Sequence, residues 1–280
     1  MIIDKDFYNY FMKPQPLDGV GDIYPIKIAE YSIFKEYASK YLLAGRKWLT
    51  NICKYPKDEY ILDFFVKNAL MMEVLEVNSN EFEEGSNITE VLKSDELLKY
   101  KISEMEEMFS MTLKKAVKFE LLSVIDDAVI DYRFQIGEGD KYITKFNFEN
   151  YREVVMEQNL LFEPLTSPSE RGNEAIQNAI KVLSKNGVTQ DLISVCSTVS
   201  TYKGVSDEEL QEYTYYRLMC DFETINRINN NIIYAMFMAQ GSKDAEITYL
   251  GEVINVSKNP YEGLLKRNGD NQLTKRLQGR

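Results

Sequence analysis

Three aspartates close together in the sequence, Asp126, Asp127 and Asp131, are the residues best suited to carry chemistry. The apolar pattern around them predicts a helix from 113 to 132, on which carboxylates four or five residues apart share a face. Such a group could bind one Mg²⁺ ion, because Mg²⁺ prefers oxygen ligands. No lysine or glutamate stands nearby at the spacing of a nuclease motif. We therefore expect a solvated helix face, with a metal site as the alternative.

Histidine is absent from the chain of 280 residues. Its absence excludes Ser-His-Asp and Cys-His nucleophile pairs, and zinc sites that need imidazole. Walker, Rossmann and kinase motifs are also absent. The three cysteines, Cys53, Cys196 and Cys220, are scattered through apolar helical patterns, which predicts reduced, buried thiols. The sequence thus predicts a binding protein without catalytic residues or a cofactor, not an enzyme.

Charge is distributed unevenly along this acidic chain, which has 33 Lys and Arg against 44 Asp and Glu, a net charge of −11. Acidic residues dominate 76–110, whereas 258–280 contains six basic and two acidic residues, a local charge of +4. An acidic protein is repelled by nucleic acid and by anionic membranes, so neither is expected as a partner. Four basic residues of the last segment are candidate contacts to an acidic protein surface: Lys266, Arg267, Lys275 and Arg276.

Hydrophobic periodicity predicts a mostly helical α+β fold. Helices are expected over 30–43, 97–109, 147–159, 173–185 and 190–203, with another from 58 onward and a long one over 206–241. That last helix carries Ile232 and Met236 on its core stripe. A short edge strand over 23–28 and a β-hairpin around 137–140 are the expected β elements. We predict an N-terminal α+β region (1–146), a helical bundle domain (147–257) and a flexible basic tail (258–280).

Aromatic residues gather near the N-terminus and around position 215. One helical turn cannot bury three neighbouring tyrosines on one face, so Tyr215 and Tyr216 are expected to lie partly off the stripe of Tyr213. There they would meet either a partner protein or a neighbouring helix. The aromatic candidates for a partner interface are Tyr24, Tyr31, Phe34, Tyr215 and Tyr216.

The first residues carry acids where a secretory signal would need a basic start and an unbroken apolar run. No stretch approaches the roughly 18 apolar residues of a membrane span. We expect a cytoplasmic protein with no membrane partner.

Two stretches carry a family resemblance. Residues 16–34 consist of a short loop, Ile-Tyr-Pro and a segment with Tyr31 and Phe34, and residues 146–159 end in Gln158-Asn159 and precede Pro164. Both resemble segments of proteins encoded in the tail-morphogenesis regions of contractile-tailed phages that infect Gram-positive bacteria. The order and length of the predicted helices up to Gly241 are similar as well.

The resemblance implies a tail-assembly or baseplate-assembly factor of the chaperone type, or a minor virion component, with no catalytic residues to carry over. It implies that the partners are other phage tail or baseplate proteins, with a homo-oligomer as a further option. The expected location is the host cytoplasm during assembly, or the virion. Two alternatives stay open: a carboxylate-dependent metal enzyme, and an inhibitor protein from a mobile element that acts by occlusion.

Overall fold

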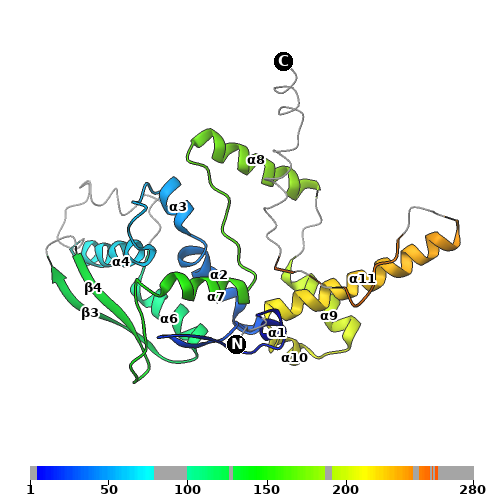
Figure 1. Ribbon diagram of the computed structural model, residues 1–280, viewed down its shortest axis with the longest axis horizontal. Helices are drawn as coiled ribbons and strands as arrows, with labels where there is room; N and C mark the ends of the chain where they lie inside the picture. The colour runs from blue at the N-terminus through cyan, green and yellow to red at the C-terminus, as the bar shows by residue number, and fades with distance from the viewer. Residues whose placement is uncertain are drawn as a thin grey trace, which may run out of the picture. The chain divides into compact units, whose positions relative to one another are not determined.

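The computed structural model describes residues 5–78, 100–125, 129–186, 191–241, 246–252, 254, 256 and 257. Helices predominate in it, beside two small antiparallel sheets (Figure 1), which confirms the predicted α+β class. The elements in chain order are α1 (Lys5–Tyr10), β1 (Gln15–Leu17), β2 (Gly21–Ile23), α2 (Ile28–Tyr41), α3 (Arg46–Asn51), α4 (Ile61–Asn78), α6 (Ile102–Leu113), β3 (Val117–Ile125), β4 (Val129–Ile136), β5 (Tyr142–Ile143), α7 (Phe148–Gln158), α8 (Glu170–Asn186), α9 (Leu192–Lys203), α10 (Asp207–Gln211) and α11 (Tyr215–Ala239).

The chain divides into two compact units. Unit 1 comprises the described parts of 1–13, 27–29 and 169–280, and unit 2 comprises 14–26 and the described parts of 30–168. The boundary expected after residue 146 falls inside unit 2, because α7 packs against α4 and against both strands of the first sheet. The expected tail lies outside the described residues.

Aromatic rings from several elements form the core of unit 2. The ring of Phe109 on α6 lies edge-on to those of Phe134 on β4 and Tyr151 on α7, with centroids 4.9 and 5.3 Å apart. Tyr41 on α2 packs in the same edge-on way against Phe65 on α4, at 5.6 Å. All five side chains are fully buried. Such pairs contribute about 0.5–1.5 kcal/mol each beyond the area that they bury.

The second sheet of unit 2 has the strand order β3-β4-β5. The predicted hairpin is confirmed as β4 and β5, with Phe134 opposite Ile143 and Gly137 in the left-handed region at φ 62°. The helix predicted over 113–132 is wrong. There α6 ends at Leu113, followed by Lys114 at φ 52°, and the chain continues as the antiparallel strands β3 and β4. Cross-strand pairing decides the conformation of a short apolar run that suits either structure.

The long helix predicted over 206–241 is broken into α10 and α11. Ser206 caps α10 by accepting from the backbone N–H of Glu209, and Thr214 caps α11 by accepting from that of Arg217. Between the two helices, Tyr213 accepts a backbone hydrogen bond from Ile28, 2.8 Å long. A tertiary contact thus competes with helix continuation at a residue that can cap a new helix.

The core of unit 1 lies between α9, α10 and the first half of α11. Its buried residues are Val195, Val199, Leu210, Tyr213, Leu218 and Ile225. Among the residues that the structure describes, Ile225 is the last buried residue of α11 in this core.

Candidate binding surface

Beyond Ile225, α11 is mostly exposed, and in Figure 1 its orange end extends past α9. Exposed fractions in this half range from 38% for Tyr234 to 60% for Met236. The exposed large apolar residues are Ile232, Ile233, Tyr234, Met236, Phe237 and Met238. Ile232 and Met236 were expected on the buried stripe, and that expectation is wrong because α9 does not extend far enough to cover them.

The last two turns of α11 are apolar on every side. From 228 to 240 the sequence carries no charge, and from 232 to 239 it reads Ile-Ile-Tyr-Ala-Met-Phe-Met-Ala. Successive residues of a helix lie about 100° apart, so this run surrounds the helix axis. A helix that is apolar all round is normally buried. The sequence therefore contained a signal for a binding surface, namely an apolar run that lacks the polar face present in the first half of α11.

The segment 246–252 extends this surface. Asn231 fixes it in place, since its side chain donates to the carbonyl oxygen of Thr248 at 2.7 Å and accepts from the N–H of Thr248 at 2.9 Å. Arg227 donates to the carbonyl oxygen of Glu252 at 2.7 Å. Three further exposed side chains join the patch here: Ile247, Tyr249 and Leu250. We call these nine exposed residues the distal α11 surface.

The size of the distal α11 surface sets it apart from ordinary surface residues. Nine large apolar side chains, most about half exposed, leave on the order of 1,000 Å² open to solvent. The largest apolar patch of a typical monomer covers about 300–600 Å². A standard protein interface buries about 800 Å² on each partner. The surface is therefore large enough for a stable protein contact.

Most of the aromatic candidates for a partner interface are not exposed. Tyr31 and Phe34 lie in the unit 2 core at 4% and 0% exposed, because the buried stripe of α2 includes both. Tyr216 is 3% exposed and its hydroxyl donates to Asp6 at 2.7 Å, which fastens α1 to α11. These three are core residues, which corrects the expectation that their rings face a partner.

The remaining partner candidates are two half-buried tyrosines and four basic residues. Tyr24 is half-buried, and its backbone N–H donates to the carbonyl oxygen of Thr112. Tyr215 is half-buried against the unit 1 core, so it took the second of the two positions that the sequence left open. The four basic candidates lie outside the described residues: Lys266, Arg267, Lys275 and Arg276.

Of the aspartate triplet, Asp131 lies on β4 and not on the predicted helix, where it is exposed and opposite Ser123. Asp126 and Asp127 lie outside the described residues. Among the residues that the structure describes, no group of three Cys, Asp or Glu side chains could hold a metal ion.

The cysteines offer little nucleophilic chemistry. Cys53 is exposed, which corrects the expectation of burial, whereas Cys196 and Cys220 are half-buried. Burial raises the pKa of the Cys220 thiol to about 12, and burial also raises the pKa of Cys53 and of Cys196. Since the thiolate is the reactive form, all three are poor nucleophiles at neutral pH.

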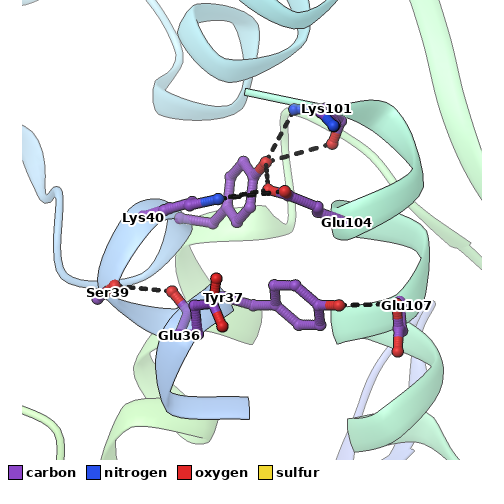
Figure 2. A network of polar contacts seen from close by, with 8 residues as sticks. Glu36, Tyr37, Ser39, Lys40, Lys101, Glu104 and Glu107 are labelled. Carbon is purple, nitrogen blue, oxygen red and sulfur yellow. Dashed lines mark hydrogen bonds and ion pairs between the residues drawn. The ribbon is translucent and has the colours of Figure 1, made fainter. Parts of the chain in front are cut away.

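Figure 2 shows a polar network between α2 and α6. Tyr41 donates to Glu104 at 2.7 Å and accepts from the backbone N–H of Lys101 at 2.9 Å, and Lys40 pairs with Glu104 at 3.0 Å. Tyr37 donates to Glu107, and this hydrogen bond raises the pKa of Tyr37 to about 12. These groups bond one another, so the network joins α2 to α6.

A second polar cluster fastens the proximal half of α11 within unit 1. Asp221 is 8% exposed and accepts from Lys203 on α9 at 2.7 Å and from the Tyr10 hydroxyl on α1 at 3.4 Å. Arg217 stacks over the ring of Tyr213, 4.1 Å from its centroid. The proximal half of the helix is thus tied on two sides, in contrast with the distal half.

Comparison with known proteins adds no assignment: no family model, curated protein or solved structure matches the chain. In the described part of the chain, none of the helices combines the length and apolar character needed to cross a bilayer.

Proposed function

We propose that this chain is a non-enzymatic assembly factor or structural component of a phage tail or baseplate, which acts by protein–protein binding. The observation that carries the binding function is the distal α11 surface, because a helix end that is apolar all round and exposed costs solubility unless a partner covers it. The phage setting rests on the sequence resemblance in residues 16–34 and 146–159.

Electrostatics supports a protein partner over nucleic acid. The chain has a net charge of −11, and the apolar run of α11 carries no charge at all. Nucleic-acid sites need basic side chains that neutralise phosphates. Recognition through the distal α11 surface would instead come from apolar burial, which is typical of the centre of a protein interface.

Co-expression with the tail and baseplate proteins encoded beside its gene tests this proposal. We expect the chain to elute with at least one of them in size-exclusion chromatography. Phe237→Glu should abolish this association, because it puts a charge at the centre of the apolar surface.

Ile193→Glu is the matched control, since Ile193 is 81% exposed on α9 of the same unit and lies apart from the distal α11 surface. This variant should still associate. A wild-type chain that elutes without any of the tail proteins would contradict the proposed function.

A further inference from the structure

We propose that the distal α11 surface is covered by a second copy of this chain, with the distal halves of two α11 helices packed antiparallel. This inference rests on the proposed binding function and names the partner of that same surface.

The spacing of residues along α11 indicates that the occupant is a helix. Leu218, Ile225, Ile232 and Ala239 follow one another at intervals of seven, and Ile228 and Ala235 stand three residues after two of them. This is the heptad pattern of helix pairing. Leu218 and Ile225 of this stripe are buried in the α9–α11 core. We therefore expect a second helix to pack on the distal part of this stripe, which α9 does not cover.

Small residues on the distal stripe favour close helix packing. Ala235 and Ala239 alternate with the larger Ile228 and Ile232 on this face. Helix axes approach to about 8–10 Å according to the side chains at the contact. In an antiparallel pair centred on the apolar run, Ala239 of one copy faces Ile232 of the other, so small residues meet large ones.

Charge does not oppose a second copy, and steric exclusion fixes its direction. Unit 1, which holds α11, has 16 acidic and 16 basic residues over 1–13, 27–29 and 169–280, so it has no net charge. Since α9 covers the same stripe at Leu218 and Ile225, a parallel partner would collide with α9, whereas an antiparallel pair places the two α9 helices at opposite ends of the contact. The contact itself contains no charge from 228 to 240, so it adds no repulsion.

The exposed area also fits self-pairing. An interface about a two-fold axis uses the same patch on both copies. The distal α11 surface exposes on the order of 1,000 Å² per copy around the helix, against roughly 800 Å² per partner in a standard interface. A single pair covers the side that carries Ile232 and Met236, whereas Ile233, Tyr234 and Phe237 lie on the opposite side of the helix.

Sedimentation velocity of the purified full-length chain, without tail proteins, tests the pairing. We expect twice the mass of one chain, which is 32.6 kDa. Met236→Glu should give the mass of one chain, whereas Ile193→Glu should leave the pair intact. Ile180→Glu on α8 should also leave it intact, since α8 takes no part in the proposed contact.

Cysteine cross-linking tests the direction in a Cys53→Ser background, where the exposed native thiol is removed. Ala235→Cys should form a disulfide with its own counterpart, because Ala235 lies beside the two-fold axis. Ala239→Cys should not, because the two copies of residue 239 lie about 10 Å apart along the helices. A parallel pair would link both variants.

A wild-type chain with the mass of one copy would overturn the inference, and so would a mass above two copies. A mass of one copy would result, for instance, if the C-terminal residues of the same chain cover the surface. A pair that survives Met236→Glu, or a pair that is lost in Ile180→Glu, would also overturn it. A monomer that still associates with tail proteins refutes the pairing and leaves the proposed function standing. A pair that associates with none of them refutes the function and leaves the pairing.

Discussion

Phe109 in unit 2 and Phe237 in unit 1 both lie on helices, yet one ring is fully buried and the other is 50% exposed. Unit 2 surrounds its aromatic residues with four helices and a sheet, so each ring meets others edge-on. Unit 1 builds a smaller core around the first half of α11 and leaves the second half uncovered in the described chain. The difference shows that apolar residues serve stability in one unit and remain available for association in the other.

The largest effect should separate these two phenylalanines. Phe109→Ala should lower the free energy of unfolding by about 3–5 kcal/mol, because it leaves a cavity among rings that cannot close it. Phe237→Ala, measured on the dissociated chain, should change it by no more than about 0.5 kcal/mol. Urea unfolding followed by helix circular dichroism checks both values. Equal losses would mean that the two sites are buried alike.

Alkaline pH should destabilise unit 2 strongly. Burial raises the pKa values of Tyr41, Tyr132 and Tyr151 above the ordinary value of a tyrosine, 10.0. The folded state thus holds these protons more tightly, so its stability is complete below pH 10 and falls as the pH rises above it. Each such tyrosine costs up to about 1.4 kcal/mol per pH unit above 10.

Trp48 provides the measurement, because it is the single tryptophan and lies on α3 in unit 2. Its fluorescence gives the urea midpoint of this unit at each pH. Tyr132→Phe should make the decline with pH shallower, since it removes one proton-linked group. A midpoint that stays constant to pH 11 would contradict the expected linkage.

Within unit 1, the buried carboxylate of Asp221 should matter more than an exposed one. Asp221→Asn should cost about 1–3 kcal/mol, because Lys203 loses its charged partner in a half-buried place. Glu212→Gln, which removes the exposed pair with Lys27, should cost less than about 1 kcal/mol. Thermal unfolding of both variants compares them. The same loss in both would show that burial does not set the strength of these pairs.

A smaller effect than that of Asp221 should come from the helix cap that begins α11. Thr214→Ala removes the hydroxyl that accepts from the N–H of Arg217, and should cost about 1 kcal/mol. Thr198→Ala serves as a control, because its hydroxyl donates within the interior of α9, to the carbonyl oxygen of Ser194. It should change stability by less than the cap. Circular dichroism during urea unfolding measures both.

Most helices could be predicted because their signals are local. The predictions over 30–43, 147–159, 173–185 and 190–203 were confirmed to within a few residues as α2, α7, α8 and α9. Gly204, at φ 68°, follows the end of α9 as the sequence predicted, since glycine adopts the left-handed conformation readily. The short helices α1 and α3 were not predicted, because a helix of one or two turns has little periodicity to detect.

The candidate site was harder to predict, because exposure depends on what packs nearby. Tyr31 and Tyr216 have the residue type of an interface yet lie in cores. Ile232 and Met236 have the spacing of a core stripe yet are exposed. In both cases spacing alone did not decide exposure, because the length and placement of neighbouring elements determine which faces of a helix are covered.

The sequence by itself determined the acidic charge, the absence of histidine chemistry, the mostly helical class and the uncharged apolar run near the end of α11. These follow from residue types and from spacings within a few turns. Only the tertiary structure decided that residues 117–125 pair as a strand, that the predicted helix over 206–241 breaks before Thr214, and that α9 stops short of the apolar run. Burial and strand pairing depend on contacts between residues distant in sequence, so local patterns could not fix them.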